Sequence, residues 1–328
     1  LGCGVDDLAK NATLGSSVIK RLRNYWQLRR ANRPRRFARL REYWRQHTSR
    51  RRFIKGALTA GGVGVATAGY TRLWEPGWLE VNRHDVPFSN NDRPIRLLHL
   101  SDLHASRVVS LDFLAHTIQI GLKQKPDLIC LTGDYITWKY HRYQEYAGVL
   151  SVLAQAAPTF ACLGNHDGGK WAGKRLGYPN ANHVRSMLAK ANITLLHNEA
   201  RRVKINECDL NLVGLGDLWN GEFLPEEAFT QIPEPAAQTI VLSHNPDTKE
   251  RLIDYQWQLL LCGHTHGGQL YIPGLGAPLA PVRDKRYVRG LHNWNDRWLH
   301  ITKGVGNLHG VRLNCRPEVS LLTLGRNG

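Results

Sequence analysis

Two histidines with one residue between them follow an apolar run that ends near residue 262. The run covers residues 259–262, and Gly263, His264 and His266 come after it. The run predicts a strand buried on both faces, which Gly263 ends. In an extended segment alternate side chains project to one side, so both imidazoles would point to the same place. Neutral imidazole is a common metal ligand, although a pair of solvated loop histidines would give the same short motif.

Four earlier apolar runs end in polar clusters of the same kind. The residues that follow these runs include Asp102, His104, Asp134, Asn165, His166, Asp167 and His244. Ligands of open α/β sheets bind at the carboxyl ends of the strands, where such side chains would gather. Five clusters between residues 102 and 266 favour a metal centre over chance surface histidines.

The positive charge of the chain is concentrated in its first 55 residues. This segment holds 16 Lys or Arg and 3 Asp or Glu, so it carries 13 of the 17 net positive charges of the 328-residue chain. The remainder is only weakly basic, and we expect no specific nucleic-acid partner for it. Cys130, Cys162 and Cys262 each close an apolar run, which is typical of small buried residues rather than of a disulfide framework.

Residues 1–48 form a basic extension with two interpretations. Aromatic and aliphatic residues are mixed with arginines between residues 16 and 47, which is typical of amphipathic helices on an anionic membrane surface. The chain begins with Leu1 and its single methionine is Met187, so an over-extended reading frame would explain the segment equally well.

Residues 49–69 resemble an export leader. Arg51 and Arg52 precede a Gly/Ala/Val stretch at 56–69 that is short and weakly apolar for a membrane span. Paired arginines before such a stretch are typical of a twin-arginine signal, and Ala66 to Ala68 offer a cleavage site. We therefore expect export machinery as a partner and a place in the periplasm or on the periplasmic face of the inner membrane. An uncleaved N-terminal membrane anchor is the alternative.

The rest of the chain divides into a connector at 70–94, with Trp74 and Trp78, and a domain at 95–328. In this domain apolar runs alternate with helical patterns, which predicts an α/β fold with helices covering the sheets. The expected strands are 95–100, 128–131, 159–163, 194–205, 208–215, 239–243 and 258–262, and the expected helices are 110–124, 141–155, 181–191, 225–231 and 247–254.

In order, the clusters read Asp-x-His, Gly-Asp, Gly-Asn-His-Asp, a lone His and Gly-His-x-His, and this set resembles the calcineurin-like metallophosphoesterases over about residues 95–325. The resemblance implies a four-layer α/β/β/α sandwich of two mixed sheets with two divalent metal ions. One ion would be held by Asp102, His104, Asp134 and His266, and the other by Asp134, Asn165, His244 and His264.

The chemistry implied by this resemblance is hydrolysis of a phosphodiester or pyrophosphate by a hydroxide that bridges the two ions. Two cations roughly 3.5–4 Å apart lower the pKa of such a water and stabilise the phosphoryl oxygens. Oxygen and imidazole ligands together fit Mn, Fe, Zn or Co. His166 would protonate the leaving oxygen. Many members orient this histidine with an aspartate where this chain has Thr137. Asp167 or a group elsewhere would have to take that role here; otherwise the acid is weaker, and phosphomonoesters with poor leaving groups are expected to be poor substrates.

The C-terminal motifs are similar to those of a bacterial phosphodiesterase branch of the family and, more distantly, of enzymes that cleave UDP-2,3-diacylglucosamine. Arg312 and Arg316 could hold a substrate phosphate, or Arg316 could pair with Glu318 in a structural loop. Three functions follow. The first is a phosphodiesterase, and the second is a pyrophosphatase of lipid A precursors that acts on a nucleotide-lipid at a membrane. The third is a metal-stabilised binding protein without turnover, which would not need His166.

Overall fold

The computed structural model describes residues 23–24, 38, 41–43, 50–88, 93–232 and 237–325. The chain divides into two compact units, residues 1–67 and 68–328. The first holds most of helix α2 (Arg50–Gly69), none of whose residues is buried. Within the described ranges, no helix is both long enough and apolar enough to span a membrane. Most of the predicted extension at 1–48 lies outside the described residues.

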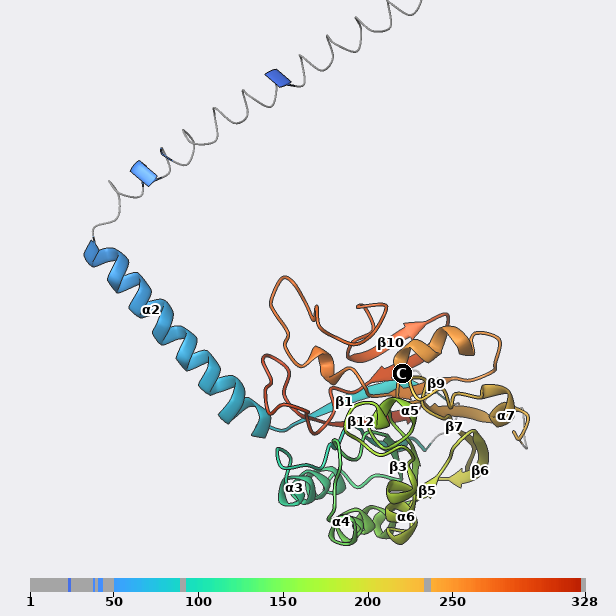
Figure 1. The fold of residues 1–328 in the computed structure, drawn as a ribbon. Coiled ribbons are helices and arrows are strands. Elements are labelled where there is room, and N and C mark those ends of the chain that lie inside the picture. Colours follow the sequence, from blue (N-terminus) through green and yellow to red (C-terminus); the bar gives the residue numbers. More distant parts are fainter. Residues whose placement is uncertain are drawn as a thin grey trace, which may run out of the picture. The chain divides into compact units, whose positions relative to one another are not determined.

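Two mixed sheets form the centre of the second unit (Figure 1). In spatial order, the strands described for the first sheet are β1 (Glu80–Pro87), β12 (Glu318–Gly325), β2 (Ile95–Leu100), β3 (Leu128–Thr132), β4 (Thr159–Cys162) and β5 (Thr194–Leu195). Those of the second sheet are β10 (Gly290–Trp294), β11 (Arg297–Ile301), β9 (Leu259–Cys262), β8 (Gln238–Leu242), β7 (Cys208–Gly214) and β6 (Glu199–Ile205).

The sheets pack face to face because their strands are apolar on both sides. In β2, Leu97 belongs to the cluster between the sheets and Leu98 to the cluster under the helices. In β9, Leu261 faces the first sheet, whereas Leu260 packs in the cluster on the outer side of the second. This alternation of fully buried side chains confirms the prediction that 259–262 is a strand buried on both faces.

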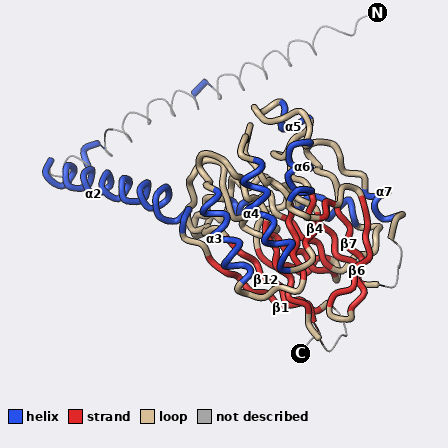
Figure 2. The backbone as a smooth tube through the Cα atoms, turned by 90° about the horizontal axis from the view of Figure 1, so that it is seen from below, coloured by secondary structure: helices blue, strands red, loops and turns tan. Residues whose placement is uncertain are grey.

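Helices cover the outer face of the first sheet (Figure 2). These helices are α3 (Leu111–Leu122), α4 (Tyr143–Ala156) and α6 (Asn182–Lys190). In α3, Ser110 caps the start by accepting a hydrogen bond from the Phe113 N–H, and Leu114 and Ile118 lie on the buried face. Outside the second sheet lie shorter segments, α7 (Pro225–Phe229) and a 3₁₀ helix (Pro246–Leu252). The four-layer α/β fold is thus confirmed, with a thinner fourth layer.

The domain begins earlier than residue 95. Strand β1 lies within the predicted connector and pairs in parallel with β12, from Glu80 beside Glu318 to Pro87 beside Gly325. It is an edge strand whose residues are mostly half-buried or exposed, so its sequence lacks the apolar run that marks a central strand. The segment at 247–254 is also different from the expectation, because the 3₁₀ helix replaces most of the predicted α-helix.

Parallel pairing brings the polar clusters to one edge. Strands β2, β3 and β4 pair in parallel, as do β8 and β9, so their carboxyl ends point the same way within each sheet. The two edges are joined directly, because the Thr132 carbonyl at the end of β3 accepts a 2.6 Å hydrogen bond from Nδ1 of His244, which follows β8.

Candidate metal centre

The first group of predicted ligands is compact and buried. Nε2 of His266 lies 3.3 Å from an Asp102 carboxylate oxygen and 3.1 Å from Nε2 of His104. Nε2 of His104 lies 3.5 Å from a carboxylate oxygen of Asp134. Three side chains of this group, Asp102, His104 and His266, place one potential ligand atom each within 4.8 Å of one another. One cation could therefore contact all three.

The second group shares carboxylates with the first. Nε2 of His244 lies 3.1 Å from Oδ2 of Asp134, and these two side chains and Asp102 form a second set of atoms within 4.8 Å of one another. The rings of His244 and His264 lie 5.1 Å apart, and Asn165 lines the same cavity as Asp134 and His264. All seven predicted ligands are thus brought to one edge of the sandwich, and Asp134 contacts histidines of both predicted sets.

The backbone at these ligands has an uncommon conformation. Asp102, His104, Asp134, His264 and His266 all have positive φ, between 48° and 69°. Such values are uncommon for residues other than glycine and are concentrated at functional sites. They correct the expectation that His264 and His266 extend in parallel: His266 turns toward Asp102 and His104, whereas His264 packs against Trp219 with ring centroids 4.2 Å apart.

Glycines permit the close approach of the two carboxylates. A Cβ at Gly164 would collide with the Asp134 carboxylate, and one at Gly263 would collide with Ser101 and the Asp102 carboxylate. Any side chain at these two positions would displace a predicted ligand, which explains why the clusters at 164–167 and 263–266 begin with glycine.

The unpaired atoms of the site fit metal ions. Oδ1 of Asn165 and Nε2 of His264 are buried and accept no hydrogen bond. A carbonyl can only accept, so Nδ1 of His244 carries the proton and its Nε2 faces the Asp134 carboxylate. Burial opposes the charged form, but Asp134 outweighs it and raises the pKa of His244 to about 10. Negative charge beside an imidazole nitrogen is what a bound cation would compensate.

The other three imidazoles are held neutral, which is the form that binds metal. Burial lowers the pKa of His104 and of His266 to about 3. Burial also lowers the pKa of His264 well below its usual value. Two carboxylates, four imidazoles and one amide oxygen therefore satisfy the donor requirements of two divalent ions.

A second layer of hydrogen bonds positions the ligands. Oγ1 of Thr137 lies 2.8 Å from Nδ1 of His104. The Asp167 carboxylate accepts hydrogen bonds from the backbone N–H groups of Asp134, Tyr135 and Gly164, so it ties the loops after β3 and β4 together. Neither side chain orients His166, and no ion pair joins a carboxylate to the His166 ring within the described residues.

His166 lies at the wall of a cavity of about 470 Å³ that opens on the predicted ligands. Its ring makes edge contacts with His104 and Trp171, with centroids 5.0 and 4.8 Å apart. Most of the remaining wall is apolar and includes Trp171, Trp219, Leu270, Leu279, Pro281, Leu308 and Val311. The position of His166 allows a proton to reach a group bound in this cavity.

Residues 95–268 match the family described as calcineurin-like phosphoesterase. The chain belongs to the calcineurin-like phosphoesterase family. It is 45% identical to phosphodiesterase YaeI of Escherichia coli, over 84% of this chain and 99% of that protein. It is 30% identical to the uncharacterized metallophosphoesterase YkuE of Bacillus subtilis, over 84% of this chain and 97% of that protein. It is 27% identical to the UDP-2,3-diacylglucosamine pyrophosphatase LpxG of Chlamydia muridarum, over 79% of this chain and 94% of that protein.

Members of this family use two divalent metal ions, and this chain has ligand clusters for them. By the motifs of the calcineurin-like phosphoesterases, the residues that would hold the ions are Asp102, His104, Asp134, Asn165, His244, His264 and His266. Oδ1 of Asn165 and Nε2 of His264, which are buried and unpaired, belong to this set.

Arg312 and Arg316, which the sequence suggested as ligands of a substrate phosphate, do not line the cavity beside the predicted metal ligands. The guanidinium of Arg312 is fully buried and donates to the carbonyl oxygens of Lys303, Gly304, Gly306 and Cys315. Arg316 stacks on Trp78, with 3.3 Å between its Cζ and the ring centroid. Among the described residues, Glu318 pairs with Lys303 and forms no ion pair with Arg316.

Sequence reasoning missed Trp171 and Trp219, which line the cavity and lie in contact with each other, 5.4 Å between ring centroids. Their backbones are linked to the ligand loops through Asn220, which donates to the Asn165 carbonyl and accepts from the Trp171 N–H. The only signal in the sequence was the position of Trp171, five residues after His166.

Proposed function

We propose that this chain is a metal-dependent phosphodiesterase whose substrates carry an apolar substituent. The observation that carries the proposal is that the predicted metal ligands Asp134, Asn165, His264 and His266 line a cavity whose other walls are mainly apolar. The calcineurin-like phosphoesterase match and the similarity to a phosphodiesterase support the reaction class.

The residues of the site have separate roles in this reaction. When bound, the two ions supply Lewis acidity toward the phosphoryl oxygens and lower the pKa of the attacking water. Asp134 contacts one histidine of each predicted ligand group, because one of its carboxylate oxygens lies within 3.5 Å of both His104 and His244. It therefore fixes the position of the two groups relative to each other. Trp171 and Trp219 exclude water from one wall. His166 holds a proton at a ring nitrogen and donates it to the leaving oxygen.

Within the described ranges, no carboxylate forms an ion pair with the His166 ring, so we expect leaving groups that need little protonation to be favoured. An aryl alcohol or a phosphate leaves without strong protonation, whereas an alkoxide does not. Aryl diesters and pyrophosphates are therefore the expected substrates, and alkyl monoesters are expected to be poor ones.

A pyrophosphatase acting on a nucleotide-lipid is the second candidate. A further cavity of about 580 Å³ is lined by Arg175, Arg251 and Arg283. Trp171 and Trp219 line both cavities. An amphiphilic pyrophosphate could place an acyl chain against the apolar walls and its anionic part beside the arginines. The similarity to LpxG supports this candidate.

Hydrolysis of a nitrophenyl phosphodiester by the purified full chain tests the proposal. After chelation, turnover should be absent and should return with Mn, Fe, Zn or Co. Binding of the diester without turnover under all four metals would support the metal-stabilised binding protein instead. A kcat/KM for UDP-2,3-diacylglucosamine far above that for the nitrophenyl diester would support the nucleotide-lipid pyrophosphatase.

We further propose that Arg51 and Arg52 direct export, so that the enzyme works in the periplasm or at the periplasmic face of the inner membrane. The paired arginines and the weakly apolar stretch after them support this. Replacing both with Lys keeps the charge but loses the planar guanidinium. If the arginines are recognised as such, the double variant should remain in the cytoplasm. Unchanged fractionation would favour an N-terminal anchor.

A further inference from the structure

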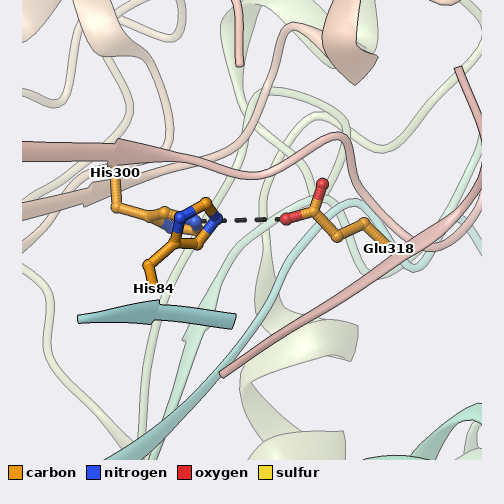
Figure 3. Close-up of side chains that lie close together, drawn as sticks. All are labelled: His84, His300 and Glu318. Atoms are coloured by element: carbon orange, nitrogen blue, oxygen red, sulfur yellow. Dashed lines mark ion pairs between the residues drawn. The ribbon is translucent and has the colours of Figure 1, made fainter. Parts of the chain in front are cut away.

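A second cluster of metal-ligating side chains lies away from the candidate centre. His84 on β1, His300 on β11 and Glu318 on β12 converge, as Figure 3 shows. One potential ligand atom of each side chain lies within 4.8 Å of the others. His300 belongs to the second sheet and the other two residues to the first, so the cluster joins the two sheets.

His300 contributes an unpaired nitrogen that points into this cluster. The residue is fully buried, and its Nε2 has no hydrogen-bond partner. The nearest carboxylate oxygen, Oε1 of Glu318, lies 4.0 Å away, which is too far for a hydrogen bond. A buried polar atom left unpaired in this way costs free energy, unless another group binds to it.

The hydrogen bonds around His300 have the arrangement that is found around metal-bound histidines. Nδ1 of His300 lies 2.9 Å from Nδ1 of His99, and Nε2 of His99 lies 2.8 Å from Oγ1 of Thr132. If His300 donates its Nδ1 proton to His99, its Nε2 carries a free lone pair. Metal-bound histidines are normally oriented by such a hydrogen bond at the other ring nitrogen.

Glu318 is oriented in the same way. Its Oε2 lies 3.5 Å from Nζ of Lys303, and its Oε1 accepts a hydrogen bond from the Ser320 hydroxyl. Lys303 thus compensates Oε2, whereas Oε1 is the oxygen that lies 4.0 Å from Nε2 of His300. His84 is partly exposed, so the cluster can be reached from solvent.

We propose that His84, His300 and Glu318 form a zinc site separate from the dinuclear centre. Two imidazoles and one carboxylate, with a water as fourth ligand, satisfy tetrahedral zinc. Zinc bonds of about 2.0–2.2 Å require Nε2 of His300 and Oε1 of Glu318, now 4.0 Å apart, to approach one another by a few tenths of an ångström when the ion binds. The ion ties β11 of one sheet to β1 and β12 of the other.

The test uses the full chain, zinc alone as the probe, and anomalous diffraction on both sides of the zinc absorption edge. Wild-type crystals should show a zinc peak between His84, His300 and Glu318 in addition to peaks at the dinuclear centre. His84→Phe should lose only the first peak. Phenylalanine retains a ring beside His300, whose centroid lies 5.1 Å from that of His84, so the fold should persist.

Zinc content in solution gives the second measurement. After removal of excess zinc, the wild type should retain about three ions per chain and His84→Phe about two. Asp85→Asn is the matched control, because Asp85 is an exposed residue on the same strand, and it should retain about three. Equal zinc content in the wild type and His84→Phe, or no anomalous peak at the cluster, would overturn the proposal. Loss of the dinuclear peaks alone would count against the proposed function and not against this site.

Discussion

Thr137 Oγ1 lies 2.8 Å from Nδ1 of His104, and this contact gives position 137 a different role from the one that the sequence suggested. From the sequence we expected Thr137 to mark the missing partner of His166. In the structure the side chain serves His104 instead. Because the Nε2 of His104 faces Asp134 and His266, the hydroxyl acts on the opposite nitrogen and sets the orientation of the ring.

Thr137→Val should therefore weaken metal binding without removing a ligand. Valine has nearly the same shape but cannot accept the hydrogen bond from His104, so we expect a loss of about tenfold in metal affinity. Metal titration of the apo enzyme measures it, and Thr137→Ser is the control, because serine keeps the hydroxyl. Equal affinities of the wild type and Thr137→Val would show that the contact does not position His104.

Asp134→Asn should be more damaging than His104→Ala or His244→Ala. One Asp134 oxygen lies 3.5 Å from His104 and 3.1 Å from His244, so the carboxylate serves both predicted ion positions. The amide removes a negative charge between two cations, and we expect kcat to fall on the order of 10³-fold, with loss of both ions. Elemental analysis and single-turnover rates measure this. Retention of both ions with most of the activity would exclude a shared ligand.

His166→Gln should separate turnover from metal binding. The ring of His166 lies at the cavity wall, and the predicted ligand clusters are formed without it. Metal content should stay near that of the wild type, while kcat falls by about 10²-fold. The loss should be greater for alkyl than for aryl diesters, because aryl leaving groups need less protonation. Loss of metal from this variant would place His166 among the ligands.

The position of the predicted metal ligands at one edge of the fold could be predicted because short stretches of the sequence determine it. Central strands such as 259–262 are continuous apolar runs, and each changes abruptly to residues with ligand chemistry, as at Asp134. Parallel pairing then brings residues far apart in the chain to one edge. Both features follow from the order of residues and from the general geometry of α/β sheets.

The features that were missed depend on contacts between distant segments. Strand β1 has no apolar run because it is a sheet edge, and its partner β12 lies more than 200 residues later. Arg312 looks like a phosphate ligand in the sequence, since nothing local reveals the four carbonyl oxygens around it. The contact of Thr137 with His104 was not predicted for the same reason: spacing in the chain does not say which histidine a side chain reaches.

Arg312→Lys should affect stability and leave the affinity for substrate unchanged. The buried guanidinium donates to four carbonyl oxygens of the loops at 303–306 and 315, and lysine cannot reproduce this planar set. We expect the free energy of unfolding to fall by about 3 kcal/mol. Chemical denaturation measures the change in stability. The KM of the wild type and of Arg312→Lys is then compared under conditions in which both are folded. A raised KM with unchanged stability would restore the substrate role of Arg312.

The apolar cavity should determine which substituent the substrate carries. Leu279 lines this cavity although the residue is 72% exposed, so a bound acyl or alkyl chain would cover it. Burying a leucine contributes about 1.5–3 kcal/mol, so Leu279→Ser should lower kcat/KM for a dodecyl nitrophenyl phosphodiester by roughly tenfold or more. The methyl nitrophenyl phosphodiester has the same leaving group but no chain to bind, and its kcat/KM should not change.

Leu275 supplies the matched control, because it is 66% exposed and belongs to the same loop but does not line the cavity. Leu275→Ser should hydrolyse both diesters at wild-type rates. If Leu279→Ser slowed the two diesters equally, the substitution would be acting on the metal centre rather than on the substituent. If neither changed, the apolar wall would not contact the substrate, and the proposed preference for an apolar substituent would have to be abandoned, while the metal-dependent hydrolysis itself would stand.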